Sequence, residues 1–414
     1  MKLCVALYLC ITQVAAGYSV LTHEAIIDTV WKDTITPLLL KRFPNSTPEE
    51  LLKAHGYCYG GAIIQDMGYY PLGSKFFSDL AHYVRSGDFI QNLLDEASDV
   101  NEYAFALGSM AHYAADGNGH REAINKAVPL VYPKLLRRYG PIVTYADNSI
   151  AHMKVEFAFD VAQLAQGNYA PQNYHDFVGF EVAQKALERA FQRTYALKLS
   201  SVTSEEVAIG TYRFAISSIL PTMTKAAWRL KKDEILKAQP SMTERKFIYN
   251  LSRASFHKEW GTKYERPGIK ARILAILFRV LPKVGPLRAF SFHAPTPAAQ
   301  TLFMKSVNST LDQYRLLLAA HGRGALKLPN LNFDTGEPVQ PGKYRLADEA
   351  YAKLVDKLVD KPVPADLREI ILAYYSDRSA PFATKRKEKA WKKLLAELDA
   401  LKTSAPASVD VESR

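Results

Sequence analysis

The chain has 414 residues, of which 48% are hydrophobic and 23% charged, and its formal net charge is +11. This composition is typical of a globular protein and excludes a disordered or fibrous one. The length predicts one large domain with an extension, or two domains. The positive charge favours anionic partners, either membrane surfaces or nucleic acid.

The first residues have the pattern of a secretory signal peptide. Lys2 precedes the apolar run 3–14, and three small residues follow at 15–17. The run is too short for a stable membrane span, and a buried amphipathic helix is the alternative interpretation. Removal of residues 1–17 leaves Cys58 as the only cysteine, so no intramolecular disulfide is expected. We therefore expect a secreted or periplasmic protein that depends on its apolar core, on bound metal, or on both.

Helical periodicity recurs along most of the chain, whereas alternating strand patterns are scarce. This pattern predicts an all-α fold. The expected helices are 23–40, 49–54, 75–83, 88–97, 101–115, 120–127, 150–164, 177–196, 204–219, 222–237, 243–258, 297–318 and 346–358. Residues 68–73, 167–172 and 328–344 are expected to form loops, the last because it is rich in Pro, Gly, Asn and Asp.

Histidines are paired with carboxylates at helical spacing. His112 precedes Asp116 by four residues, and His152 precedes Glu156 by four. Residues four apart lie on the same face of a helix, so each pair can point at one spot. Imidazole and carboxylate ligands without cysteine suit a catalytic zinc site, which keeps a coordination position for water. The pattern predicts a metal-dependent hydrolase.

Each candidate has an ordinary structural alternative when it is considered alone. His23 could begin a helix, Asp66 could be a turn residue, and His82 could be a core histidine. His112 is different because it follows a long apolar run, in which an uncompensated imidazole is costly to bury. A buried histidine followed one turn later by Asp116 indicates either a ligand pair or a supporting carboxylate–histidine pair.

A series of ordered motifs resembles a known family over roughly residues 18 to 200. They are Gly-Tyr-Ser-Val-Leu-Thr-His at 17–23, Gln-Asp at 65–66, Ala-His-Tyr at 81–83, Ala-His-Tyr-Ala-Ala-Asp at 111–116, His120, and His-Met-Lys-Val-Glu at 152–156. The chain resembles the zinc-dependent phospholipase C family, whose fold is shared by fungal single-strand-specific zinc nucleases. The resemblance implies an all-helical domain that holds three zinc ions in a cleft.

The resemblance also implies which residues hold each ion, and it makes Asp66 the candidate general base. The implied ligands are Asp66, His82, His112 and Asp116 for the first ion; Asp116, His23 and the mature N-terminus at Tyr18 for the second; and His120, His152 and Glu156 for a more labile third. Cleavage after Ala16 would instead make Gly17 the first residue.

The chain departs from the family pattern at two places. Tyr18 stands where the family typically has Trp. Asp116 and His120 are four residues apart, where the family usually has a longer link that contains proline. On an unbroken helix the residues at 112, 116 and 120 would form one stripe. Alternatively, Gly117 and Gly119 end the helix and turn His120 away.

All candidate ligands precede residue 157, which predicts the division of the chain. We expect a signal peptide at 1–17, a catalytic domain at 18–240, a basic helical extension at 241–402 and a disordered tail at 403–414. The apolar, basic segment 271–288 is either a core helix or a membrane-interface segment.

The expected activity is phospholipase C-type hydrolysis of phospholipids by a water molecule that two or three zinc ions activate. The enzymatic alternative is a nuclease specific for single-stranded nucleic acid, and the other alternative is a non-enzymatic protein of the cell envelope stabilised by zinc. No nucleotide cofactor is expected, because the chain lacks a phosphate-binding glycine loop.

Overall fold

The computed structural model describes residues 19–69, 73–166, 181–203 and 293–403, with a few isolated positions between 228 and 244. Apart from one short hairpin, the regular structure of these residues is helical, and the predicted all-α fold is confirmed. The predicted signal peptide, Tyr18, the three helices expected between 204 and 258 and the apolar segment 271–288 lie outside the described residues.

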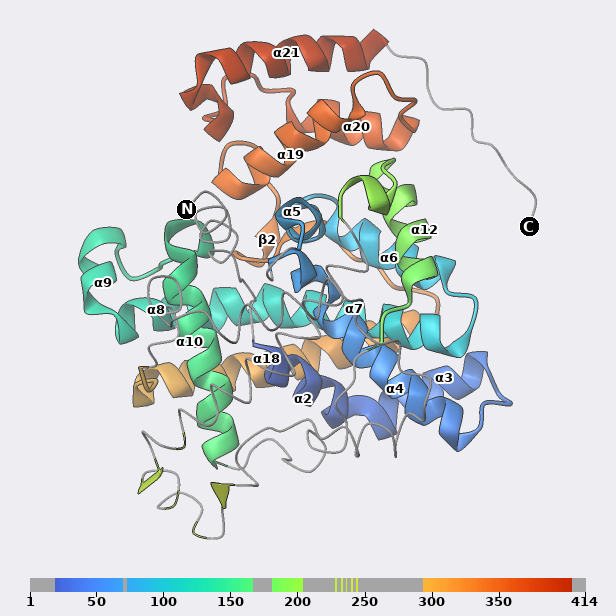
Figure 1. The fold of residues 1–414 in the computed structure, drawn as a ribbon, viewed down its shortest axis with the longest axis vertical. Helices are drawn as coiled ribbons and strands as arrows, with labels where there is room; N and C mark the ends of the chain where they lie inside the picture. The colour runs from blue at the N-terminus through green and yellow to red at the C-terminus, as the bar shows by residue number, and fades with distance from the viewer. Residues whose placement is uncertain are drawn as a thin grey trace, which may run out of the picture.

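Two helices that touch along their backbones form the centre of the fold (Figure 1). They are α4 (Pro48–Ile63) and α7 (Val100–Asn118). Thr47 begins α4 with a capping box and a proline at the first position, and Asp99 begins α7 by accepting from two backbone amides. Their close contact depends on glycine: a Cβ at Gly61 would lie 1.8 Å from the Phe105 carbonyl oxygen, and one at Gly108 would lie 1.9 Å from that of Cys58.

The other elements surround this pair. Before α7 lie α2 (Val20–Val30), the π-helix η1 (Trp31–Ile35), α3 (Thr36–Arg42), the 3-10 helix η2 (Ile64–Tyr69), α5 (Lys75–Tyr83) and α6 (Ser86–Glu96). After it lie the π-helix η3 (Gly119–Ile124), α8 (Asn125–Val131), α9 (Pro133–Tyr139), α10 (Tyr145–Gln166), α12 (Gln184–Tyr195) and the 3-10 helix η4 (Leu199–Ser201). The C-terminal part contains α18 (Pro297–Gly322), β1 (Leu331–Asn332), β2 (Glu337–Pro338), α19 (Arg345–Leu358), α20 (Ala365–Tyr374), the 3-10 helix η7 (Ala383–Arg386) and α21 (Glu388–Thr403).

Most described helices coincide with predicted ones, and α5 has the predicted limits. The predicted helix 49–54 is too short, because α4 continues to Ile63 through three glycines, of which Gly61 is required by the packing against α7. The sequence analysis missed α9 and α20, and it treated the hairpin of β1 and β2 as part of a loop.

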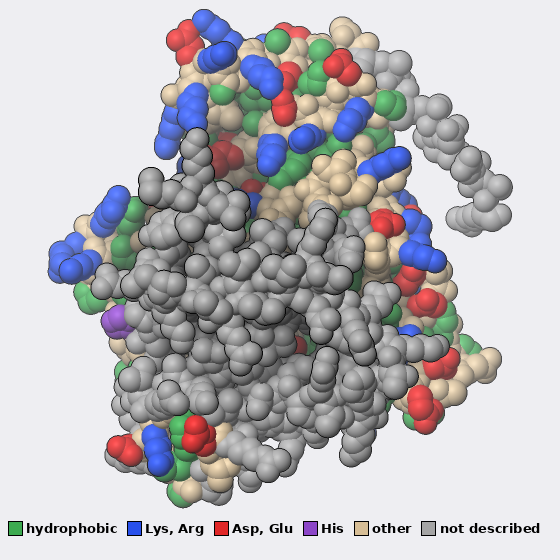
Figure 2. Space-filling view, viewed as in Figure 1, with side chains coloured by type: hydrophobic (Ala, Val, Ile, Leu, Met, Phe, Trp, Pro, Cys, Tyr) green, Lys and Arg blue, Asp and Glu red, His purple; other side chains and the backbone are tan. Residues whose placement is uncertain are grey.

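The C-terminal part packs directly on the N-terminal helices. The Tyr314 hydroxyl of α18 donates to the Leu107 carbonyl of α7 over 2.8 Å. Helices α19 to α21 form a further layer at one end of the molecule (Figure 1), and Figure 2 shows lysine and arginine side chains scattered over it. Trp391 stacks on Phe382, with ring centroids 5.5 Å apart, and this contact docks α21 onto the segment that precedes it. Among the helices of the described residues, none has the length and hydropathy that a membrane span requires.

Replacing Gly108 by Ala should lower the free energy of unfolding by about 1–3 kcal/mol, because the added Cβ must push α7 away from α4. Gly117 on the same helix provides the matched control, since a Cβ there meets only Leu331 Cδ1 at 4.0 Å. Gly117→Ala should leave stability unchanged or raise it by up to about 1 kcal/mol. Denaturant titration measures both variants, and equal stability of the two would contradict the close helix contact.

Candidate metal centre

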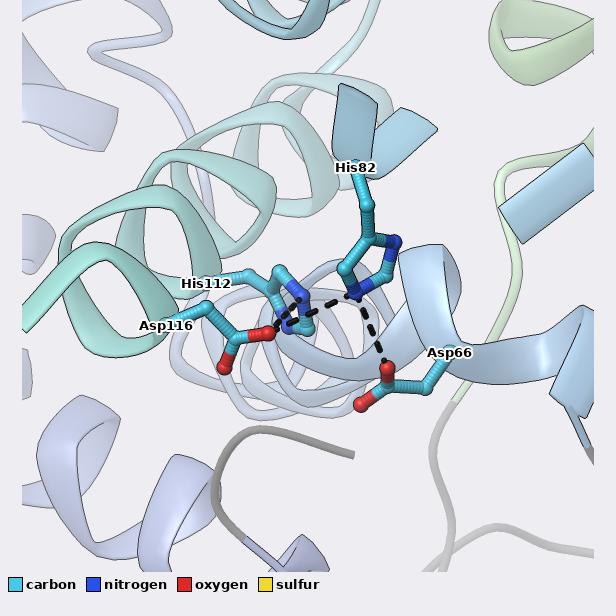
Figure 3. A group of neighbouring side chains, drawn as sticks. All are labelled: Asp66, His82, His112 and Asp116. Carbon is cyan, nitrogen blue, oxygen red and sulfur yellow. Dashed lines mark ion pairs between the residues drawn. The ribbon is translucent and has the colours of Figure 1, made fainter. Parts of the chain in front are cut away.

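Four side chains from three elements meet beside the C-terminal part of α7 (Figure 3). Asp66 comes from η2, His82 from the last turn of α5, and His112 and Asp116 from successive turns of α7. We call these four residues the first group. His82 Nε2 lies 3.3 Å from Asp66 Oδ1 and 3.4 Å from Asp116 Oδ2, and His112 Nε2 lies 3.2 Å from Asp116 Oδ2.

These distances suit a shared metal ion. Two ligands about 2.0–2.1 Å from a tetrahedral zinc lie roughly 3.3–3.4 Å from each other. One ligand atom from each member of the first group lies within 4.8 Å of all the others. The four ligand atoms are therefore close enough together to bind one zinc-sized cation.

Hydrogen bonds orient both histidines of the first group so that their Nε2 atoms face the carboxylates of Asp66 and Asp116. His82 Nδ1 lies 2.8 Å from the Ser78 carbonyl oxygen, and His112 Nδ1 lies 2.9 Å from that of Ala62. A carbonyl oxygen only accepts, so each Nδ1 carries the proton and each Nε2 offers a lone pair. Among the described residues, His112 Nε2, Asp66 Oδ1 and both Asp116 oxygens are buried without a hydrogen-bond partner. Such a set of buried lone pairs fits a metal ion.

The charges of the first group also favour a bound cation. Burial raises the pKa of Asp66. Although burial opposes it, the neighbouring His112 holds the pKa of Asp116 well below its usual value. Burial likewise opposes the shift of His82, but its contacts with Asp116 and Asp66 raise the pKa of His82 to about 10. The two carboxylates thus need positive charge beside them, which a proton on His82 or a divalent ion supplies.

His120, His152 and Glu156 converge as a second group. His120 lies in η3, a π-helix that directly continues α7. Gly117 and Gly119 therefore do not end the helix. His120 Nε2 consequently stays within 3.9 Å of Asp116 Oδ2. His152 Nε2 donates to the Val143 carbonyl, which leaves Nδ1 3.5 Å from Glu156 Oε1. Burial lowers the pKa of His152 to about 4, which keeps the ring in the neutral form that binds metal.

His23 lies on the other side of Asp116. Its Nε2 is 3.5 Å from Asp116 Oδ1, and its ring stacks on that of His112 with centroids 4.7 Å apart. Burial lowers the pKa of His23 to about 3. Asp160 on α10 holds α2 in this position, because its carboxylate accepts from the Leu21 amide over 3.0 Å. Asp116 can therefore bridge the position beside His23 and the position inside the first group.

All the predicted ligands except Tyr18 thus lie in or beside the two groups. That they bind metal stays a prediction. The aromatic residues near them serve packing: Tyr69 is buried with its ring edge on His82, and Phe77 is buried against Phe191.

Two residues at this centre were missed by sequence reasoning, and both belong to the hairpin of β1 and β2. The Phe333 ring contacts those of His82 and His112, with centroids 5.3 and 5.8 Å apart. Asp334 Oδ1 lies 3.5 Å from His120 Nε2. The surrounding Asn-Phe-Asp-Thr-Gly reads only as a turn, so the sequence carries no signal for their role.

Residues 22–205 match the family model described as zinc dependent phospholipase C. The resemblance predicted from the motifs is confirmed over this segment, which includes both groups and none of the C-terminal part. Comparison with curated proteins and with solved structures found no match.

Zinc should stabilise the protein strongly. At a free concentration about 1,000 times its Kd, a ligand adds roughly 4 kcal/mol to the free energy of unfolding, which corresponds to roughly 5–10 °C in Tm. Excess chelator should therefore lower the Tm by about this amount, and added zinc should restore it. Differential scanning calorimetry measures the change. An identical Tm with chelator and with zinc would count against a metal at this centre.

Proposed function

Given this family match, we propose that the protein is a secreted zinc-dependent phosphodiesterase that hydrolyses phospholipids in the manner of a phospholipase C. The family match supports a phospholipase C-type function. The observation that carries the proposal is the first group, in which two imidazoles and two carboxylates meet at tetrahedral spacing inside the matched segment.

The chemistry divides between the metal and the side chains. Bound zinc lowers the pKa of a water molecule toward about 7 and offsets the charge of the phosphoryl oxygens. His82 and His112 hold their lone pairs toward the ion because backbone carbonyls fix their other nitrogens. Asp66 is the general base of the proposal: Oδ1 faces His82, and the second carboxylate oxygen can accept the proton of the attacking water.

The aromatic rings beside the predicted ligands favour a lipid substrate over a single-stranded nucleic acid. A nuclease of this kind would stack bases on aromatic side chains beside the metals. In the part of the chain that the structure describes, the rings that contact ligand imidazoles are those of Tyr69, Tyr83, Tyr145 and Phe333, and all four are buried. They offer no open face to a base. The net charge of +11 suits an anionic membrane surface.

Secretion is the second element of the proposal, and it rests on the N-terminal sequence. The predicted signal peptide ends at residue 17, so that Tyr18 would be the mature N-terminus. N-terminal sequencing of the exported protein tests this element directly.

Replacing Asp66 by Asn should reduce the turnover of phosphatidylcholine by roughly 10²–10⁴-fold, because the variant cannot accept a proton. The assay compares phosphatidylcholine vesicles with single-stranded DNA in parallel, and hydrolysis of the lipid alone is expected. Asp79→Asn is the control, since Asp79 is a nearby buried carboxylate that pairs with Lys75 outside both groups. Its activity should stay within a few-fold of the parent.

Zinc content and the melting curve of Asp66→Asn should accompany the assay. Full activity of this variant would refute the role of Asp66. Hydrolysis of DNA without hydrolysis of lipid would refute the substrate, and inactivity of the zinc-loaded parent on both would refute the enzyme.

A further inference from the structure

The hairpin of β1 and β2 reaches the metal centre from the C-terminal part of the chain. Its strands pair Leu331 with Pro338 and Asn332 with Glu337. The Phe333 amide donates to the His82 carbonyl over 3.2 Å, which fixes the hairpin to α5. Gly336 fixes it to α7: its φ is +67°, and a Cβ there would lie 2.2 Å from the Gly117 carbonyl oxygen. The tip between the strands is therefore held against two helices that carry predicted ligands.

At this tip the Asp334 carboxylate is 2% exposed. Asp334 Oδ2 accepts from the Tyr83 hydroxyl over 2.8 Å and from the Tyr344 hydroxyl, while the Asp334 carbonyl accepts from Asn125 Nδ2 over 2.7 Å. Among the described residues, no lysine or arginine forms an ion pair with it. Its other oxygen, Oδ1, faces His120 Nε2 at 3.5 Å. A buried carboxylate requires a partner that offsets its charge, and among the described residues His120 forms the ion pair with Asp334.

His120 needs this carboxylate for the same reason that the other histidines need their carbonyls. His82, His112 and His152 each use one ring nitrogen on a backbone carbonyl and turn the other toward their group. His120 Nδ1 is buried without a hydrogen-bond partner among the described residues. Nδ1 is thus the nitrogen left for a metal beside His152 Nδ1, and Nε2 is the nitrogen left to donate to Asp334.

We propose that Asp334 is the positioning residue of His120. It accepts the Nε2 proton, fixes the tautomer with Nδ1 toward the second group, and strengthens the imidazole as a metal ligand. The inference rests on the proposed function only in that the second group binds zinc. It makes the C-terminal part, which lies outside the matched segment, a contributor to the metal centre.

Zinc affinity tests the proposal without reference to activity. Competition with a fluorescent chelator resolves the weaker zinc ions of the purified full-length protein. Asp334→Ala should lower the affinity of the weakest site by about 10–100-fold, the usual effect of removing such a partner. Asp334→Asn should recover most of this loss, because its amide oxygen still accepts from Nε2. The tighter zinc of the first group should be unchanged in both variants.

Asp348→Asn is the matched control, since Asp348 is equally buried in the C-terminal part and also accepts from a tyrosine hydroxyl. It should leave every zinc affinity unchanged. If Asp334→Ala fails to fold by its melting curve, Tyr344→Phe replaces it, because it loosens Asp334 and should weaken the same site several-fold.

Unchanged affinity in Asp334→Ala, or in Tyr344→Phe where it replaces that variant, overturns the proposal. Equal loss in the Ala and Asn variants also overturns it, because it makes Asp334 a direct ligand. A parent protein that binds no zinc refutes the proposed function instead.

Discussion

The structure depends on the burial of one carboxylate. Asp116 is fully buried, and four imidazole nitrogens surround its two oxygens at 3.2–3.9 Å: those of His23, His82, His112 and His120. A charge in such a position is costly unless opposite charge and hydrogen bonds offset the lost solvation. The packing of α4 on α7 helps to supply these partners. The two helices are close enough for the Ala62 carbonyl to accept from His112 and so to fix its ring beside Asp116. Helices α2 and α5 bring His23 and His82, and η3 brings His120.

Local spacing made part of this centre predictable. His112 and Asp116 share a helix face, as do His152 and Glu156, and a spacing of four residues is enough to establish that. The limits of α5 followed from its apolar periodicity. The periodicity of the sequence does not predict which helix faces pack against each other, because contacts between helices depend on the packing of the whole domain. The resemblance to a family supplied that information for residues 18 to 200, and the match to residues 22–205 agrees with it.

Two features were beyond sequence reasoning for physical reasons. Gly117 and Gly119 are residues that commonly end helices, but tertiary contacts override this preference and the helix continues as η3. Asp334 lies 251 residues from Tyr83, which donates to it, and no local pattern links residues so far apart. The hairpin was predicted as part of a loop, although its Phe333 ring packs against His82. A candidate metal centre can therefore include contacts from a segment whose sequence indicates only a turn.

The central claim is that these buried imidazoles and carboxylates hold divalent ions. Diffraction from crystals of the zinc-loaded protein, recorded on both sides of the zinc absorption edge, tests it most directly. We expect one anomalous peak about 2.0–2.3 Å from His82 Nε2 and His112 Nε2, and another beside His152 and Glu156. A map without a peak between His82 and Asp116, or with zinc bound only at surface residues, would contradict it.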